Sequence, residues 1–169
     1  MKKVLFVIIL GFFALGFKAN AQSSPVPGNY VLKAKEDYAK YNEDIIKTID
    51  WLQQTPWSAE PERKKANAFL MAWITGSPTI SIDVNADVLM KFCGKNGELL
   101  MSFMGGYTKL SIENKGVTKL QGDIAGVKAM VYKYNSDAGR VKDKAMENLV
   151  KLDKEGKLED WVKTDFEKK

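Results

Sequence analysis

Apolar residues recur every three or four positions along most of the chain beyond residue 35, which is the spacing of amphipathic α-helices. The stretches that carry this pattern are residues 38–52, 66–74, 88–92, 100–110, 117–134, 141–152 and 158–166. The connections between them are short, and short connections favour antiparallel neighbours. The pattern therefore predicts an all-α protein, a compact bundle of six or seven short amphipathic helices.

Residues that are typical of helix starts and helix ends lie at the limits of these stretches. Asp37, Asn85 and Asn96 stand where side-chain caps are expected at helix starts. The most regular stripe, residues 66–74, is followed by a glycine and then a proline, the usual order at a helix end. These signals place the helix boundaries close to the limits of the apolar stripes.

Residues 79–84 break the helical pattern, because Ile80, Ile82 and Val84 alternate with polar residues as in a β-strand. No second stretch of this kind is present to pair with it, and an unpaired strand leaves its backbone hydrogen bonds unsatisfied. The sequence therefore favours an extended connector at residues 79–84. The alternative is an edge strand that awaits a partner.

Glycines at Gly105-Gly106, Gly122 and Gly126 lie within helical stretches, where they lower helix stability. Glycines four residues apart on one helix face allow a neighbouring helix to approach closely. We therefore expect one face of the helix over 117–134 to allow close backbone approach by a neighbour, and we expect the same of the helix over 100–110.

The N-terminus has the three parts of a secretory signal peptide: a basic start, an uninterrupted apolar run from Val4 to Phe17, and an A-x-A cleavage site ending at Ala21. The apolar run is too short for a comfortable membrane span. The sequence therefore predicts a signal peptide over residues 1–21, a flexible proline- and serine-rich tether over 22–34, and a single helical domain over 35–169. It also predicts export to the periplasm or beyond the cell, with no membrane span after cleavage.

Charge argues against a nucleic-acid partner. Three lysines and no acidic residue belong to the signal peptide, so the net charge of +5 falls to +2 in the mature chain. The remaining lysines are spread along the sequence, whereas nucleic-acid binders concentrate basic residues on one face.

Two absences exclude whole classes of chemistry. The chain has no histidine, which removes Ser-His-Asp triads, Cys-His dyads and histidine zinc sites. It has one cysteine, Cys93, so no disulfide forms within the chain. Cys93 ends an apolar stretch and is expected to be a buried hydrophobe; the alternative is a reactive or dimer-forming thiol. No catalytic residue and no cofactor is predicted.

The acidic residues do not indicate a metal site or a catalytic site. Residues 83–87 imitate the opening of a calcium loop, but the glycine and the bidentate glutamate of that loop are missing, so no metal site is predicted. The carboxylate pairs are expected to face solvent, and no acid is expected in an apolar setting that raises its pKa as a glycosidase acid requires. The pairs are Glu43 with Asp44, Glu60 with Glu62, and Glu159 with Asp160.

Aromatic residues are the remaining candidates for binding. Trp57 lies in a turn between two helical stretches, close to Arg63 at the start of the second one, where it either stacks on a ligand or clamps the start of the helix. Trp73 and Tyr107 lie on helix stripes, where core packing is the usual role and the lining of an internal cavity is the alternative. The candidate ligand-binding residues are therefore Trp57, Arg63, Trp73 and Tyr107.

These observations favour an exported, non-enzymatic helical domain that binds a protein or an envelope component. Two alternatives remain: a hydrolase of cell-wall or polysaccharide material that uses acidic residues, and a small-molecule carrier with a cavity inside the bundle. The pattern specifies neither the ligand nor the oligomeric state.

Overall fold

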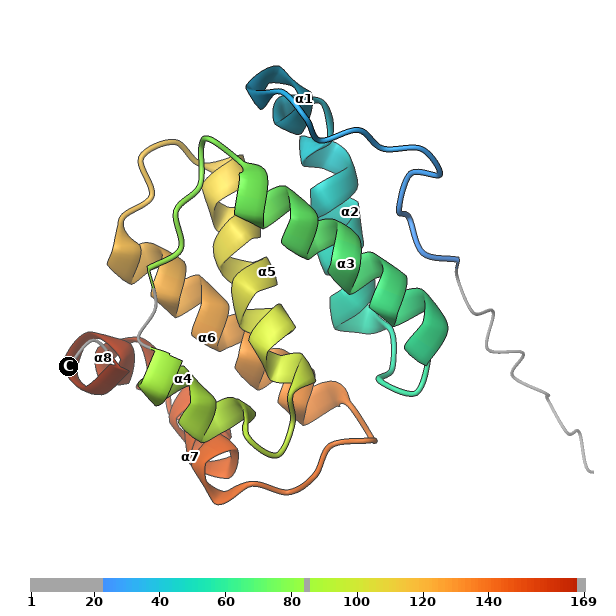
Figure 1. Cartoon of the computed structure of the whole chain (residues 1–169). Helices are drawn as coiled ribbons and strands as arrows, with labels where there is room; N and C mark the ends of the chain where they lie inside the picture. The colour runs from blue at the N-terminus through green and yellow to red at the C-terminus, as the bar shows by residue number, and fades with distance from the viewer. Residues whose placement is uncertain (1–22, 84–85, 167–169) are drawn as a thin grey trace, which may run out of the picture.

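The computed structural model describes residues 23–83 and 86–166. The described part of the chain is helical without strands, which confirms the all-α prediction (Figure 1). The elements are α1 (Lys35–Lys40), α2 (Asn42–Gln54), α3 (Glu60–Gly76), α4 (Ala86–Cys93), α5 (Glu98–Glu113), α6 (Lys119–Ser136), α7 (Lys144–Lys154), α8 (Leu158–Trp161) and the π-helical turn η1 (Val162–Phe166). The signal peptide predicted for residues 1–21 and the cap predicted at Asn85 lie outside the described residues.

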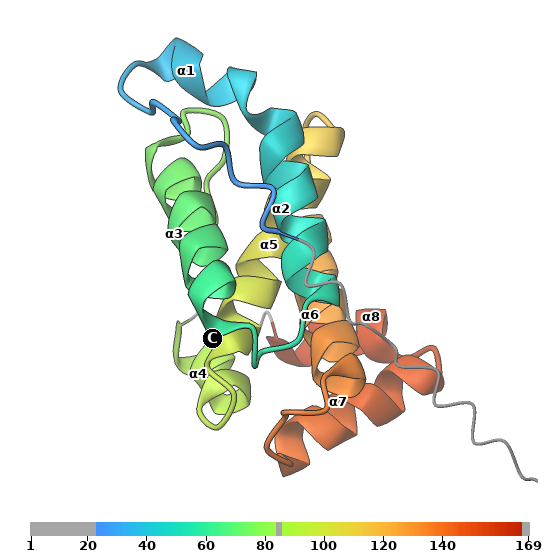
Figure 2. The same ribbon diagram turned by 90° about the vertical axis from the view of Figure 1, so that its right-hand side faces the viewer.

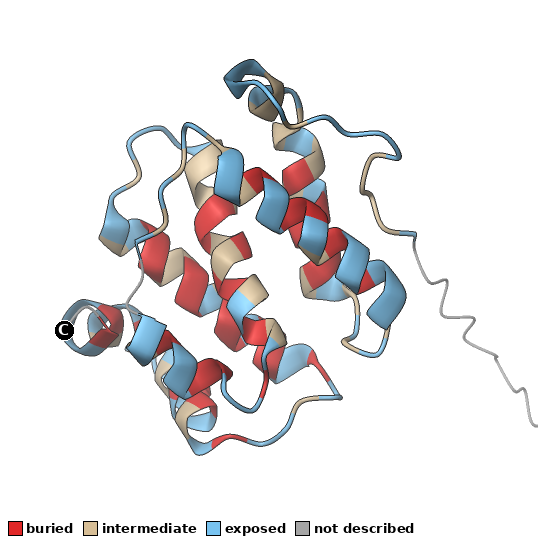
Figure 3. Cartoon of the chain, in the orientation of Figure 1, coloured by how far each residue is buried: buried red, intermediate tan, exposed pale blue. Residues whose placement is uncertain are grey.

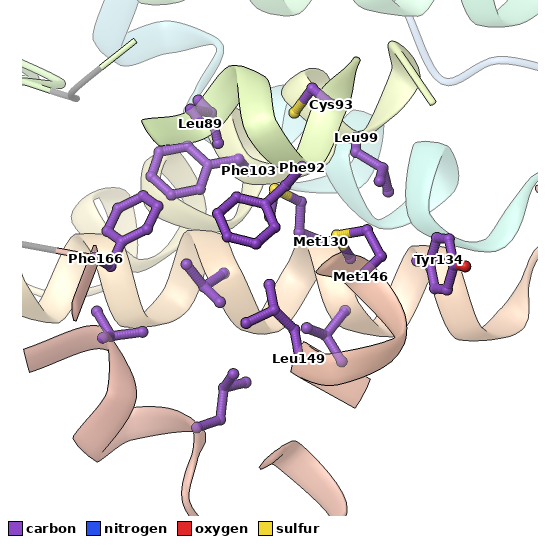
Figure 4. Packing of buried hydrophobic residues seen from close by; sticks show 14 of the residues in the cluster. Leu89, Phe92, Cys93, Leu99, Phe103, Met130, Tyr134, Met146, Leu149 and Phe166 are labelled. Atoms are coloured by element: carbon purple, nitrogen blue, oxygen red, sulfur yellow. The ribbon is translucent and has the colours of Figure 1, made fainter. Parts of the chain in front are cut away.

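Helix α5 is the centre of the fold, and buried residues line it on more than one side (Figure 3). One side packs with α4, α6, α7 and the C-terminal turns into the larger hydrophobic cluster (Figure 4). The other side meets α2 and α3, where Met101 and Ile112 of α5 pack against a second cluster. That second cluster consists of Ile45, Ile49, Trp51, Leu52, Ala66, Phe69, Leu70 and Trp73.

Glycines allow the close approach expected from the sequence, and the two helices that they bring together are α5 and α6. A Cβ atom on Gly106 would lie 2.6 Å from the Ala125 carbonyl oxygen, and one on Gly126 would lie 2.6 Å from the ring of Phe103. Gly122 lies against the ring of Tyr107 in the same way. Side chains at these positions would force the two helices apart, so the glycines set the spacing of this helix pair.

The N-terminal part of the fold differs from the sequence pattern in two ways. The helix expected over 38–52 is divided at Tyr41 into α1 and α2, and α1 begins at Lys35, so Asp37 lies in the first turn and does not precede it. Residues 23–34, expected to form a flexible tether, run over α2 and α3 (Figure 2). Val26 and Leu32 pack on the second cluster, and the Tyr30 ring lies 4.5 Å from that of Phe69.

Two further elements connect the helices. Residues 79–83 form neither helix nor strand, in agreement with a connector, and Ile80 and Ile82 are half-buried against different clusters. The helix expected from residue 141 begins at Lys144, because the Asp143 carboxylate caps it by accepting hydrogen bonds from the N–H groups of Ala145 and Met146. None of the described helices combines the length and the apolar character that crossing a membrane requires.

Candidate functional site

A cleft of about 520 Å³ opens at one end of the bundle. Its walls come from three segments: residues 57–67 at the start of α3, residues 95–98 at the turn before α5, and residues 139–141 in the loop after α6. These segments lie in the lower right part of the molecule in Figure 1. The volume lies within the range of about 300–1,000 Å³ that is usual for ligand sites.

The cleft brings together two of the four residues predicted to bind a ligand. Trp57 and Arg63 both line it, together with Lys64, Asn67 and Glu98. Trp57 is half-buried, whereas Arg63 is only 2% exposed. The turn between α2 and α3 therefore places an aromatic ring and a buried cation in the same wall.

Arg63 is fixed by four hydrogen bonds. Its Nη1 donates to the carbonyl oxygens of Leu52 and Thr55, at 2.7 Å each, at the end of α2. Its Nε and Nη2 donate to Glu98 Oε2, at 3.2 and 2.7 Å. The last carbonyl groups of a helix lack partners within the helix and form the negative end of its dipole, so a cation is stabilised there.

Lys133 of α6 approaches the same helix end from the other side. Its Nζ donates to the carbonyl oxygen of Thr55 at 2.6 Å and forms an ion pair with Asp137 at 2.9 Å, and both side chains are almost fully buried. The ammonium group also lies 5.9 Å from the centre of the Trp57 ring. Burial lowers the pKa of Lys133, and the hydrogen bond with Asp137 opposes that shift.

Asp137 joins two walls of the cleft. Its carboxylate accepts hydrogen bonds from the backbone N–H of Trp57 at 3.0 Å and from that of Gly139 at 2.9 Å. Burial alone would raise the pKa of this carboxyl group, but the hydrogen bonds from Lys133, Gly139 and Trp57 together lower it. Asp137 is therefore an ionised group that positions both the Trp57 turn and the loop after α6.

Asn96 holds the third wall and does not cap α5. Its Nδ2 donates to the Val141 carbonyl oxygen at 2.9 Å, and its Oδ1 accepts from the Val141 N–H at 2.8 Å. The N-cap of α5 is Gly97, without a side-chain cap. The prediction of an Asn96 cap is wrong because this side chain is used to tie the loop after α6 to the turn before α5.

Two polar atoms of cleft-lining residues are buried without a hydrogen-bond partner: Trp57 Nε1, a donor, and Asn67 Oδ1, an acceptor. The assignment of the Asn67 amide follows from its neighbour, because Nδ2 donates to both oxygens of the Glu98 carboxylate at 3.3–3.4 Å. The acceptor is therefore the atom left unsatisfied, and such atoms are uncommon in folded proteins.

Trp73 and Tyr107, the other two predicted residues, lie away from the cleft. Trp73 is 1% exposed in the second cluster, and its Nε1 donates to the Tyr38 carbonyl oxygen at 2.9 Å. Tyr107 is buried in the larger cluster against Gly122. Neither residue is part of the lining of the cleft.

Among the acids, Asp123, Asp137 and Asp143 are buried, and each forms an ion pair with a lysine. Hydrogen bonds and ion pairs lower the pKa of several carboxyl groups, opposite to the shift that a general acid needs. This holds for Asp37, Asp137, Asp143, Glu155 and Glu159. In the described ranges, no three His, Cys, Asp or Glu side chains form a group that could hold a metal ion.

Sequence reasoning missed Asn67, Glu98, Lys133 and Asp137. Helical spacing offers a signal for two of these groupings. Asn67 follows Arg63 by four positions on α3, and both donate to Glu98. Asp137 follows Lys133 by four positions, and the two form an ion pair. Glu98 has no such signal, because its partner Arg63 lies 35 residues away.

Fold and cleft together define an all-α domain with a polar, internally braced surface site. Comparison of the chain with protein-family models, with curated proteins and with solved structures gives no match.

Proposed function

We propose that the protein is an exported, non-enzymatic helical domain that binds a protein or an envelope component in the cleft beside Trp57. The observation that carries this proposal is the bracing of the cleft. Asp137, Arg63 and Asn96 each tie one of its walls to another part of the fold. A site whose walls are fixed before the ligand arrives loses less entropy on binding.

The composition of the cleft also favours recognition over catalysis. Two acids line it: Glu98 is engaged by Arg63 in an ion pair of 2.7 Å, and Glu60 is exposed in the first turn of α3. The cleft has no histidine, because the chain has none. Lys64 and Lys95 are exposed at the cleft and carry charges that a ligand can reach.

The two alternatives find less support. A carrier with a cavity inside the bundle needs Trp73, Phe103 or Tyr107 to face an open space, but all three are buried in the hydrophobic clusters. A hydrolase of the predicted kind needs a carboxylic acid with a raised pKa, whereas the pKa values of the Asp137, Asp143 and Glu155 carboxyl groups are lowered.

Capture from a periplasmic extract tests the proposal. The mature protein is immobilised beside two variants of equal charge: Lys64→Glu with Lys95→Glu in the cleft, and Lys65→Glu with Lys91→Glu outside it. All four lysines are exposed, so both variants are expected to fold, which circular dichroism checks. We expect a component retained by the mature protein and the control but lost from the cleft variant. Equal retention by all three proteins would contradict the proposal.

A further inference from the structure

Asn96 is followed by Gly97, and this is the one Asn-Gly step in the sequence. We propose that Asn96 is a site of spontaneous deamidation, which reacts when the loop after α6 detaches and then prevents that loop from returning to its place. The reaction uses the chain's own atoms and water, so it does not depend on what the cleft binds.

The chemistry follows from these two residues. The backbone nitrogen of Gly97 loses its proton and attacks Cγ of Asn96, the new C–N bond closes a succinimide ring, and the side-chain nitrogen leaves as ammonia. Water then opens the ring at one of its carbonyl carbons and leaves either aspartate or isoaspartate at this position. A side chain on the second residue hinders the attack, and glycine has none. Asn96 is therefore expected to react fastest among the asparagines of the unfolded chain.

The fold holds the Asn96 amide against the loop. Its Nδ2 donates to the carbonyl oxygen of Val141 at 2.9 Å, its Oδ1 accepts from the Val141 N–H at 2.8 Å, and the residue is 5% exposed. The backbone is held as well, since the Asn96 N–H donates to the Cys93 carbonyl oxygen and the Asn96 carbonyl oxygen accepts from the Leu99 N–H, both at 3.0 Å. Closing the ring requires Cγ to approach the Gly97 nitrogen, which rotates the amide and breaks its bonds to Val141. The reaction is therefore slow as long as the loop is in place.

The loop after α6 is able to detach without unfolding of the helices. Residues 138–142 are exposed or half-buried. The hydrogen bonds of Gly139 and Arg140 run to Asp137, at the start of the same loop. A surface segment that buries few side chains opens at a lower free energy than the whole fold. Detachment of this loop is therefore a local event.

The product does not restore the original contact. An aspartate side chain still accepts from the Val141 N–H, but it has no donor for the Val141 carbonyl oxygen and places a negative charge beside it. Isoaspartate also lengthens the backbone in the turn before Glu98, whose carboxylate holds Arg63. Deamidation therefore loosens the wall of the cleft that residues 139–141 form, and the change is permanent.

Mass spectrometry of peptides from the incubated protein measures the reaction, because deamidation changes the mass of the peptide that contains Asn96. The mature protein is incubated at mildly alkaline pH, and the same chain in guanidinium chloride is the unfolded reference. We expect Asn96 to react at least about tenfold more slowly in the folded protein, because both hydrogen bonds to Val141 must break first. Urea below the unfolding transition should change this rate little, because detachment of the loop exposes little surface.

Gly97→Ala is the matched control. A Cβ atom at this position meets nothing within 4 Å, and the φ of −55° suits alanine, so the variant is expected to fold, which circular dichroism checks. Because the added methyl group hinders ring closure, Asn96 should deamidate much more slowly in this variant than in the unmodified chain when both are unfolded. Equal rates in the two unfolded chains would exclude the succinimide route and overturn the inference.

Asn96→Asp reproduces one of the products and tests its effect on the cleft. Amide hydrogen exchange, followed by NMR, compares the Val141 N–H in this variant and in the unmodified protein. We expect exchange at Val141 to be at least about threefold faster in the variant, a larger change than at Phe103 in the buried part of α5.

Three further results would overturn the inference. Equal rates in the folded and unfolded chain would mean that the fold does not hold the reaction back. A rate that rises with urea as steeply as global unfolding would mean that the loop does not detach by itself. Exchange at Val141 that is unchanged or slower in Asn96→Asp would mean that the product still holds the loop. Capture from the extract is a separate experiment, so none of these results decides the proposed function.

Discussion

Arg63 and Lys133 donate to the same acceptor, the carbonyl oxygen of Thr55, at 2.7 and 2.6 Å. The two cations come from α3 and α6, and both are almost completely buried. Their shared position is explained by the end of α2, where carbonyl groups without partners attract positive charge. This contact joins three helices beneath the cleft, so the stability of the fold and the shape of the site depend on the same residues.

Replacing Arg63 by Met tests this dependence. The substitution keeps an apolar stem but leaves the Leu52 carbonyl without the Arg63 hydrogen bond and Glu98 without its cation. We expect the free energy of unfolding, measured in urea, to fall by about 2–4 kcal/mol. Arg63→Lys should recover only part of the loss, because an ammonium group lacks the planar fork that reaches α2 and Glu98 together. A loss below about 0.5 kcal/mol, the usual range for surface substitutions, would contradict this role.

The buried Asp137 carboxylate should make the free energy of unfolding depend on pH. Its pKa in the folded protein is lowered from 3.8, so its ion pair contributes stability above that value, and the contribution is lost as pH falls through the folded pKa. Asp137→Asn should therefore lower the free energy of unfolding by about 2–4 kcal/mol at pH 7 and flatten its decline below about pH 4. Urea unfolding between pH 2 and pH 7 measures both effects.

The control for this experiment is Glu62→Gln, a charge removal at an exposed position at the start of α3. The free energy of unfolding of this variant should decline at acidic pH as steeply as that of the unmodified protein. An Asp137→Asn variant whose stability declines with acid as steeply as that of the unmodified protein would show that the carboxylate is not linked to folding.

The helices were predictable because their signal is local. The stripe over 66–74 recurs at helical spacing, and Ala66, Phe69, Leu70 and Trp73 are all buried in α3. The break at Tyr41 was not predictable, because the apolar spacing continues through it and the helix is interrupted only where α1 turns to pack beside residues 23–34. Such a bend is decided by tertiary contacts and not by residue spacing.

The site was predictable only in part. Trp57 and Arg63 are close in sequence, so one turn brings them together, and the prediction placed both beside the same start of a helix. The remaining walls come from residues 95–98 and 139–141, which meet the first wall only after folding. Asn96 illustrates the difficulty, because its position before α5 is typical of a cap, whereas its side chain binds the backbone of Val141, 45 residues away.

Cys93 provides a prediction on reactivity. Burial raises the pKa of its thiol from 9.0 to about 11, so at pH 8 the thiolate fraction is about a hundredfold lower than for an ordinary cysteine. We expect negligible labelling by Ellman's reagent in the native protein and complete labelling of one thiol in guanidinium chloride. Rapid labelling under native conditions would favour the alternative of a reactive thiol.

The close contact between α5 and α6 should make the protein sensitive to a larger side chain at Gly106. A Cβ atom at Gly106 would lie 2.6 Å from the Ala125 carbonyl oxygen and 2.6 Å from the Ala129 Cβ, and a backbone atom cannot move aside as a flexible side chain does. Gly106→Ala should therefore lower the free energy of unfolding by about 1–3 kcal/mol, although alanine favours helix more than glycine does. Gly28→Ala is the control, because a Cβ there meets nothing within 4 Å. Urea unfolding compares the two variants, and a Gly106→Ala protein as stable as the unmodified one would mean that the two helices do not lie this close.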